Sequence, residues 1–295
     1  MLILAGDHLY RMDYKAMAEF HWANKADITV AVQPISKEEV TRFGILKREA
    51  NGRISSFVEK PKDPEVQKKF ISRDDPERPF LGSMGIYMFK TRILIDLLTN
   101  FPNHDDFGGD IIPEAIKSHA VYGFDFNGYW QDIGTIRSFY ETNLALTTPE
   151  TPFNFYDAKL PIYTDTRFLP GSIVEDSNLR DVLISEGSRI LKSEITHSII
   201  GIRSQIATGC VIKDSIVMGS DYYERDDEGL PIGIGANCHI EGAILDKNAR
   251  IGDNVTILPF PRNADIDNEK WYVRDGIVVI PKDIEIPSGT RIAPE

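Results

Sequence analysis

Cysteine, long apolar runs and clustered positive charge are all scarce in this sequence. Its 295 residues include two cysteines, Cys210 and Cys238, too few for a disulfide framework and without the spacing of metal ligands. No apolar run reaches the length of a membrane span, and the first residues lack the basic lead of a signal peptide. We therefore expect a cytoplasmic protein, or a plastid protein whose transit peptide is not in this sequence.

The charge is strongly acidic. The net charge is −12, from 33 basic and 45 acidic residues, and no block of Lys and Arg stands out. Such a surface repels a phosphate backbone and an anionic membrane, so we expect neither a nucleic-acid polymer nor a membrane as partner. A site for a small phosphorylated ligand would be a local exception to this field.

The first 150 residues alternate strand-like with helix-like segments. Strands are expected at 1–5, 28–32, 53–58 and 83–89, and helices at 14–26, 93–98, 110–119 and 135–146. This alternation predicts an α/β domain with a mainly parallel sheet covered on both faces. The apolar run at the start is typical of a buried parallel strand, and a domain that begins with a central strand suggests a missing front.

The second half has a period of six residues. Six segments carry apolar residues six positions apart, with Gly or Asn three after the first and a small side chain next. They are 168–174, 184–190, 206–212, 234–240, 251–257 and 286–292. Each fits a flat strand and a corner where Gly or Asn accepts left-handed backbone. Such repeats predict a parallel β-helix with an aliphatic core, in which both cysteines are structural corner residues.

Breaks in these two patterns suggest the domain limits. Prolines and Thr-Pro steps end all periodicity after the last helix of the first half. We expect a first domain at 1–147, a linker at 148–163 and a β-helix domain at 164–295. The stretches 220–230 and 263–270 break the hexad rhythm and are expected to be loops.

Two acidic residues follow predicted strands. Asp7 comes directly after the first strand, and Asp132 lies in the turn before the helix at 135–146. In an open parallel sheet, ligands bind beyond the carboxyl ends of the strands. Two carboxylates there suit Mg²⁺, which takes one or two carboxylates plus substrate oxygens. Either acid could instead cap a helix, and Asp13 is available for the same task.

A Glu-Lys-Pro turn follows the strand at 53–58. Glu59 could bind a sugar hydroxyl and Lys60 a phosphate, because lysine is a mobile point charge. A solvated turn is the simpler interpretation. Ser83 could contact a ligand or only end a turn. Trp130 is more typical of packing than of catalysis.

The motifs of both halves occur together, in one order, in a known family. They are Gly-Asp-His-Leu-Tyr-Arg-Met-Asp-Tyr (6–14), Phe-Gly-Ile-Leu (43–46), Phe-Val-Glu-Lys-Pro (57–61), Ser-Met-Gly-Ile-Tyr (83–87), Asp-Phe-Gly-Gly-Asp-Ile-Ile-Pro (106–113), Tyr-Trp-Gln-Asp-Ile-Gly-Thr (129–135), Pro-Ile-Gly-Ile-Gly (231–235) and Ile-Leu-Asp-Lys-Asn-Ala-Arg-Ile-Gly (244–252). Over essentially its whole length, the chain resembles the glucose-1-phosphate adenylyltransferases. The resemblance implies a partial Rossmann-like nucleotidyltransferase domain followed by a left-handed parallel β-helix.

The resemblance also implies a reaction. Glucose 1-phosphate would attack the α-phosphate of ATP, giving ADP-glucose and pyrophosphate for glycogen or starch synthesis. Asp7 and Asp132 would hold a catalytic Mg²⁺. Alignment of the substrates and charge neutralisation by the metal and Lys60 would carry the catalysis, without a covalent protein intermediate.

Binding roles follow in the same way. Glu59, Lys60 and Ser83 would bind glucose 1-phosphate, with Lys60 on its phosphate, and Gly44 would permit close approach of the sugar nucleotide. The family is tuned by sugar-phosphate effectors and is typically tetrameric, so the resemblance implies a homo- or hetero-tetramer. Three basic residues match effector positions, although ordinary surface charge would also explain them: Arg167, Lys247 and Lys282.

The sequence departs from the family in one respect. The Gly-rich loop that offers backbone N–H groups to the triphosphate should precede Gly6-Asp7, and this sequence does not contain it. We therefore expect the parent protein to be an enzyme and this chain alone to have low activity.

Three other interpretations stay open. One is a related nucleotidyltransferase with another base or sugar, because the residues that would face the base are absent. Another is a non-catalytic regulatory subunit, although Asp7, Lys60 and Asp132 are intact. The third is a β-helix acyltransferase, for which His197 and His239 are candidate bases without an evident partner.

Overall fold

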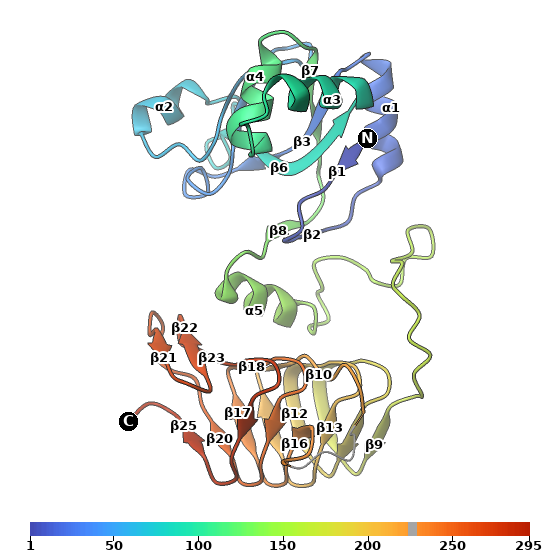
Figure 1. The fold of residues 1–295 in the computed structure, drawn as a ribbon, viewed down its shortest axis with the longest axis vertical. Helices are drawn as coiled ribbons and strands as arrows, with labels where there is room; N and C mark the ends of the chain where they lie inside the picture. Colours follow the sequence, from blue (N-terminus) through green and yellow to red (C-terminus); the bar gives the residue numbers. More distant parts are fainter. Residues whose placement is uncertain (224–228) are drawn as a thin grey trace. The chain divides into compact units, whose positions relative to one another are not determined.

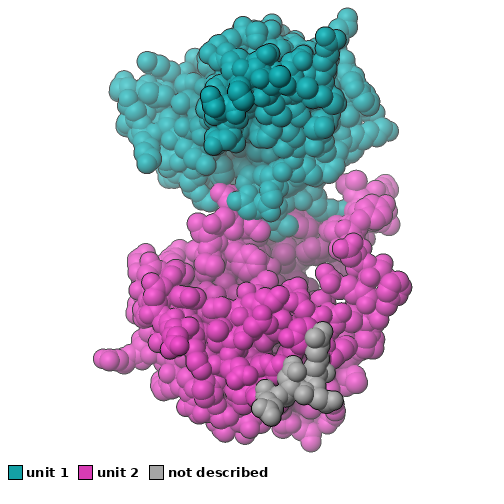
Figure 2. Space-filling model, viewed as in Figure 1, with its two compact units in different colours: residues 1–130 teal, residues 131–295 magenta. Residues whose placement is uncertain are grey.

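The computed structural model describes residues 1–223 and 229–295. The chain divides into two compact units, 1–130 and 131–295 (Figure 1; Figure 2). Each unit has its own hydrophobic core and is described by itself.

The first unit combines short helices with one main sheet. Its strands are β1 (Leu2–Ile3), β2 (His8–Tyr10), β3 (Ile28–Ile35), β4 (Ile45–Arg48), β5 (Ile54–Val58), β6 (Phe80–Phe89) and β7 (Val121–Asp125). Its helices are α1 (Tyr14–Ala23), α2 (Pro64–Lys69), α3 (Thr91–Asn100), the π-helix η1 (Phe107–Ile111) and α4 (Ile112–Ile116). The α/β class predicted from the sequence is confirmed.

The sheet of this unit departs from the mainly parallel pairing expected. Its strand order is β5-β4-β6-β3-β7, with β1 also paired to β6. Strands β3 and β7 are parallel, whereas β6 runs antiparallel to β1, β3 and β4. Short connections explain part of this pattern: β4 and β5 join through a turn at Gly52 (φ 87°), and a tight turn can join only antiparallel strands.

The expected strand at 1–5 is shorter and less buried than predicted. Only Leu2–Ile3 forms β1, and it pairs antiparallel with β6, with Leu2 opposite Met88. Met1 and Leu4 are exposed. The apolar run therefore does not form the buried parallel strand that its composition predicted.

Helices cover both faces of this sheet. Along β3, Val30 and Val32 face a core that includes Leu94 of α3, whereas the intervening Ala31 packs with Met17 of α1. Successive side chains of a strand point to opposite faces, so β3 is buried on both sides. This explains why its sequence is apolar without alternation.

Among its described residues, the second unit has one helix and many short strands. Strand β8 (Trp130–Asp132) crosses its boundary and α5 (Ile136–Ala145) follows. The remaining strands are β9 (Ile173–Glu175), β10 (Asn178–Ile184), β11 (Arg189–Leu191), β12 (Glu194–Ile200), β13 (Gln205–Ile206), β14 (Val211–Lys213), β15 (Ile216–Val217), β16 (Gly233–Ile234), β17 (His239–Glu241), β18 (Ala243–Leu245), β19 (Arg250–Ile251), β20 (Thr256–Ile257), β21 (Ile266–Asp267), β22 (Tyr272–Arg274), β23 (Ile277–Ile280), β24 (Glu285–Ile286) and β25 (Arg291–Ile292).

These strands stack in parallel from coil to coil, as the hexads predicted. One aliphatic row runs up the side formed by β11, β13, β16, β19 and β24: Ile190, Ile206, Ile234, Ile251 and Ile286. A second row runs up the neighbouring side: Ile195, Ile212, Ile240, Ile257 and Ile292. All ten side chains are buried in one core. The predicted parallel β-helix is confirmed (Figure 1).

The corners between these rows have the predicted left-handed backbone at five of six hexads. The residues with positive φ are Gly187, Gly209, Asn237, Asn254 and Gly289; Gly171 of the first hexad is not among them. Cys210 and Cys238, which follow two of these corners, are each 1% exposed and unpaired by a disulfide. Both cysteines are thus structural, as expected.

Helix α5 packs on the β-helix within the second unit. Tyr140 of α5 belongs to a buried cluster with Ile216 and Ile244 of the coils. Arg137 Nε donates to Asp275 Oδ2 at 2.7 Å. The sequence pattern predicts this helix in the first domain, whereas the compact units separate before it, after residue 130. The domain limits at 147 and 164 stay a prediction from sequence.

The two expected loops differ in outcome. The stretch 263–270 contains β21, which forms an antiparallel hairpin with β22. The stretch 220–230 lies partly outside the described residues, which omit 224–228. Among the described residues, no helix is long and apolar enough to cross a membrane.

Candidate functional site

The four predicted substrate-binding residues lie together around Glu59. Lys60 Nζ lies 3.4 Å from Glu59 Oε1. Gly44 is so close that a Cβ built on it would lie 2.5 Å from Glu59 Oε2. The backbone N–H of Ser83 donates to the carbonyl of Gly44 at 2.7 Å. The structure therefore brings Gly44, Glu59, Lys60 and Ser83 together, which we call the Glu59 cluster.

The local backbone explains why the adjacent side chains of Glu59 and Lys60 differ in exposure to solvent. Lys60 has a left-handed φ of 42°, and its N–H donates to the Phe43 carbonyl at 3.3 Å. The following Pro61 is buried and fixes the exit from β5. As a result the Glu59 side chain is 27% exposed, whereas that of Lys60 is 58% exposed. The lysine is thus open to a ligand and the carboxylate is mostly shielded.

Charge in this cluster is partly balanced. Burial raises the pKa of Glu59 above its ordinary value, the Lys60 ammonium opposes that rise, and the Asp106 carboxylate adds to it. A carboxylate that is short of water gains from any donor that replaces the lost solvent. A sugar hydroxyl is such a donor.

The sequence analysis missed three further members of this cluster. Tyr87 OH lies 3.4 Å from Ser83 Oγ, and burial raises the pKa of Tyr87 to about 12, so the phenol stays neutral. Asp106 Oδ1 accepts from the N–H groups of Gly108 and Gly109. A Cβ on Gly108 would lie 2.6 Å from Glu59 Oε2.

The stretch Asp106-Phe107-Gly108-Gly109 contains a sequence signal for two of these members. Two glycines directly before a helix indicate a close approach of the backbone to something else. The partner of that approach, Glu59, lies about fifty positions earlier, so the sequence alone could not name it.

The two predicted metal ligands have no part in capping the nearby helices. Asp13 caps α1, accepting from Lys15 N at 2.9 Å, so Asp7 is not needed for that task. Thr135 caps α5 through a capping box with Ser138. The structural alternative for both acids is thereby removed.

The surroundings of the two acids differ. Asp7 is mostly exposed, with Oδ1 3.6 Å from His8 Nε2, while His8 Nδ1 lies 3.0 Å from the Met84 carbonyl. Asp132 Oδ1 accepts from the N–H of Gly134 at 2.7 Å. Because Asp7 and Asp132 belong to separately described units, their meeting at one ion stays a prediction.

The donor chemistry of these acids fits Mg²⁺. Both offer carboxylate oxygens, the ligands that this ion prefers, and substrate oxygens complete its shell. The described residues contain no group of three or more His, Cys, Asp and Glu side chains that could hold a metal by themselves. Mg²⁺ at these two acids would take its remaining ligands from water and from substrate phosphates.

Trp130 is a packing residue, as expected. Its ring lies 4.7 Å from the Phe43 ring and 5.2 Å from His8, centroid to centroid. Its Nε1 is buried and has no hydrogen-bond partner within the described part of the chain. Through Phe43, this ring supports the backbone at Gly44, directly before β4.

Two of the three predicted effector residues lie together in the second unit. Lys247 Nζ is 2.8 Å from Asp221 Oδ1, and Lys282 Nζ is 2.6 Å from Asp221 Oδ2. Arg167 lies on the exposed stretch before β9. The structure thus brings the two lysines to one carboxylate.

The histidines considered for acyl transfer do have carboxylate neighbours. His197 Nδ1 lies 2.6 Å from Asp214 Oδ1, and His239 Nε2 lies 3.9 Å from Glu241 Oε2. His197 also has a positive φ of 45°. Its carboxylate contact fixes an imidazole on a left-handed corner, a structural role that needs no substrate.

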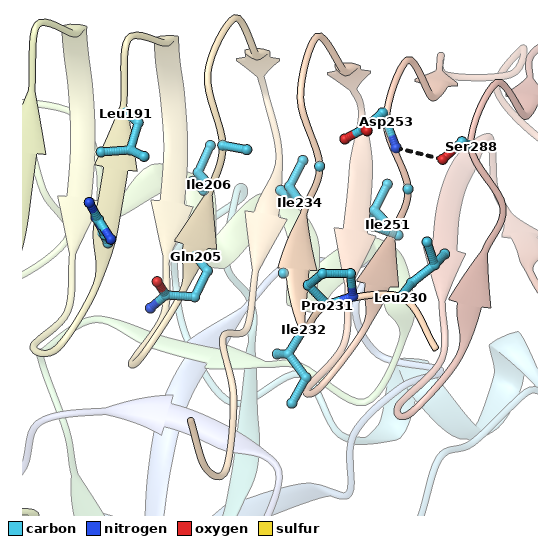
Figure 3. A pocket seen from close by; sticks show the side chains of 15 residues that line it. Leu191, Gln205, Ile206, Leu230, Pro231, Ile232, Ile234, Ile251, Asp253 and Ser288 are labelled. Carbon is cyan, nitrogen blue, oxygen red and sulfur yellow. Dashed lines mark hydrogen bonds between the residues drawn. The ribbon is translucent and has the colours of Figure 1, made fainter. Parts of the chain in front are cut away.

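A pocket of about 330 Å³ lies on one side of the β-helix (Figure 3). Aliphatic side chains such as Ile206, Ile234 and Leu230 form most of its wall, and Asp253 N donates to Ser288 Oγ at 3.0 Å along its edge. Arg189 also lines the pocket, so a phosphate would meet one guanidinium on a mostly apolar wall. The pocket shares no residue with the Glu59 cluster.

Comparison with known proteins agrees with the fold. Residues 1–149 match the family model described as nucleotidyl transferase, and residues 167–291 match the one described as GLGC left-handed parallel beta-helix domain. The chain is 44% identical, over 312 residues, to a protein of Triticum aestivum named glucose-1-phosphate adenylyltransferase small subunit, chloroplastic/amyloplastic.

That alignment covers 99% of this chain and 66% of the wheat protein, so the chain spans 66% of its relative's length. The resemblance inferred from the motifs is confirmed, as is the left-handed β-helix. The chain belongs to the nucleotidyl transferase family, with a second domain of the GLGC left-handed β-helix type.

Proposed function

We propose that this chain serves an enzyme that transfers the adenylyl group of ATP to glucose 1-phosphate. The products would be ADP-glucose and pyrophosphate, for glycogen or starch synthesis. The name of the wheat relative supports the substrates. The observation that carries the proposal is the Glu59 cluster, where an open lysine stands beside a shielded carboxylate and two glycines leave room around it.

In this site Lys60 binds the phosphate of glucose 1-phosphate. Its ammonium is more than half exposed and can turn from Glu59 to a dianion. Glu59 then accepts from a sugar hydroxyl, which replaces the water that burial has removed. Ser83 adds a neutral hydroxyl, held by the phenol of Tyr87 at 3.4 Å.

Asp7 and Asp132 would hold Mg²⁺, which supplies neutralisation of phosphate charge when it is bound. The protein's own part is alignment: Lys60 and Glu59 fix the two ends of the sugar phosphate so that its oxygen faces the nucleotide. No side chain of the cluster needs to form a covalent intermediate.

This chain by itself is proposed to turn over slowly. It spans 66% of its wheat relative's length, and turnover needs the nucleotide side of the site as well as the sugar-phosphate side. The sugar-phosphate side of the site, in contrast, lies within the described residues. Binding of glucose 1-phosphate should therefore survive where turnover is weak.

The test separates binding from turnover. Glucose 1-phosphate is titrated calorimetrically into the chain, into Lys60→Gln and into the matched control Lys62→Gln, an exposed lysine two positions on. Loss of one charge-assisted contact of about 1.5–3 kcal/mol predicts roughly 10- to 150-fold weaker binding for Lys60→Gln and no change for the control. Equal affinity in all three proteins would remove Lys60 from the site.

Turnover is measured from pyrophosphate, Mg²⁺ and a panel of ADP-, UDP-, dTDP- and GDP-glucose. Consumption of ADP-glucose alone, lost in Asp132→Ala, supports the adenylyl assignment. Consumption of another sugar nucleotide instead would replace it with a nucleotidyltransferase of different base specificity.

Assembly and compartment belong to the same proposal. The relative is named a small subunit, which supports a mixed oligomer in which this chain has a catalytic or a regulatory role, as a homo- or hetero-tetramer. The relative's name also gives chloroplast or amyloplast, which supports the plastid alternative over the cytoplasm.

Regulation by anions completes the proposal. Lys247 and Lys282, with Arg167 as a further candidate, are proposed to bind a sugar-phosphate effector. The pairing of the two lysines at one carboxylate supports this, because the same two ammonium groups can hold a phosphate.

A further inference from the structure

Stacking of the coils places Lys247 and Lys282 side by side. Strands β18 and β23 are neighbours in the β-helix, with Leu245 opposite Ile280, and each lysine lies two residues after its strand partner. Adjacent coils are about 4.8 Å apart. Two ammonium groups are thus held on one edge by the regular repeat of the fold.

A single carboxylate from a third turn lies between these lysines. Asp221, beyond β15, contacts Lys247 with one oxygen at 2.8 Å and Lys282 with the other at 2.6 Å. Its backbone N–H donates to Asn248 Oδ1 at 2.8 Å, which anchors it to the coil of Lys247. Both oxygens of Asp221 are therefore engaged by the cations.

The surrounding charges fit this arrangement. Lys247 and Lys282 hold the pKa of Asp221 well below its usual range. Asp221, Asp283 and Asp246 in turn raise the pKa of Lys282, so its ammonium stays charged. The three side chains are 34%, 32% and 49% exposed for Asp221, Lys247 and Lys282, so a solute can reach them.

We propose that Asp221 is an internal competitor of an anionic ligand at the Lys247–Lys282 pair. Without ligand, its carboxylate occupies the position of the anion; a phosphate or phosphomonoester displaces it and takes both ammonium groups. The proposal rests on the effector-binding part of the proposed function and adds the residue that opposes such binding. No covalent bond is made or broken in the exchange.

The exposure of the group sets the size of the effect. Exposed ion pairs contribute about 0.2–1 kcal/mol each, so freeing both lysines from Asp221 should tighten anion binding by roughly 2- to 30-fold. The same exposure makes the contact weak enough for millimolar anions to break.

The experiment titrates inorganic phosphate calorimetrically into the full chain at low ionic strength. Asp221→Asn keeps the shape of the side chain and removes its charge. Asp267→Asn is the matched control, because it also removes one negative charge and one exposed ion pair, with Arg274 on the β21–β22 hairpin. A third variant, Lys247→Gln/Lys282→Gln, lacks both ammonium groups. A fourth variant combines these two replacements with Asp221→Asn.

We expect tighter phosphate binding in Asp221→Asn only, and loss of that gain when both lysines are replaced. Equal or weaker binding in Asp221→Asn would overturn the proposal while leaving the lysines as an anion site. Binding that ignores the double lysine replacement would overturn the proposal together with the effector site. If Asp221→Asn does not fold, as judged by circular dichroism, Asp221→Ser is titrated in its place against the same predictions.

None of these readouts uses turnover. Failure of the adenylyl assignment appears in the sugar-nucleotide panel, and failure of the competitor role appears in the phosphate titration. The two results are therefore separable.

Discussion

Replacement of Gly44 by alanine tests the packing of the Glu59 cluster directly. A Cβ at this position would lie 2.5 Å from Glu59 Oε2 and 2.5 Å from Phe57 Cζ. Ordinary contacts between carbon atoms are about 3.5–4.0 Å, so both neighbours must move. The φ of Gly44 is not in the left-handed region, so the backbone accepts alanine and only the side-chain clash is tested.

The magnitude follows from what has to shift. Phe57 is the penultimate residue of β5 and packs against the main core of the first unit. Overpacking of this kind destabilises a domain by about 1–3 kcal/mol. Because Glu59 must also move, Gly44→Ala should weaken glucose 1-phosphate binding as well as folding.

Unfolding of the first unit can be followed through Trp130. The chain has three tryptophans: Trp22 is 70% exposed and changes little on unfolding, Trp271 belongs to the second unit, and Trp130 packs on Phe43. Urea unfolding is therefore measured by fluorescence in a Trp271→Phe background. Gly6→Ala is the control, because a Cβ there meets nothing within 4 Å.

Gly44→Ala should lower the free energy of unfolding by about 1–3 kcal/mol, and Gly6→Ala by less than about 0.5 kcal/mol. Two equal values, or a Gly44→Ala protein as stable as the parent, would show that Glu59 and Phe57 do not hold the positions described here.

Two further predictions concern Glu59 and the β-helix corners. Burial raises the folded-state pKa of Glu59, so the stabilising contribution of its protonated form is present below the unfolded pKa and is lost as pH rises through the folded pKa. Glu59→Gln should accordingly melt above the parent at neutral pH, with a difference that shrinks toward pH of about 4, while binding glucose 1-phosphate less well; a pH-independent difference in Tm contradicts this. Asn237 forms a corner of the β-helix with a φ of 56°. The free energy of unfolding should fall by about 1–2 kcal/mol in Asn237→Val and by much less in Asn237→Gly, because left-handed backbone costs energy for a residue with a Cβ. Thermal unfolding of the β-helix measures both variants, and equal losses would refute the backbone argument.

The β-helix could be predicted from sequence because its determinants are local and repeated. The apolar positions, the Gly or Asn corner and the small residue after it recur within seven residues, so the pattern identifies Cys210 and Cys238 as buried without reference to distant residues. The one corner that lacks the left-handed backbone, Gly171, lies in the first hexad, which has no coil before it to fix its conformation.

The Glu59 cluster could be predicted only in part because its contacts are long-range. The sequence indicates the adjacent residues Glu59 and Lys60. The approach of Gly108 and the cap at Asp106 come from η1, which lies far from them in the sequence. The pairing of Asp221 with Lys247 and Lys282 likewise depends on three turns of the coil. The pattern of charges along the sequence does not predict such long-range contacts.

The docking of α5 on the coils bears on how this architecture can be exchanged between genes. The two family matches leave a gap between residues 149 and 167, at which genetic recombination could join domains from different genes. A recombination there would separate α5 from the β-helix, exposing Ile216, Ile244 and Ile277 and leaving Asp275 without Arg137. The segment that keeps these residues covered begins before α5. Recombined proteins should therefore carry α5 together with the β-helix.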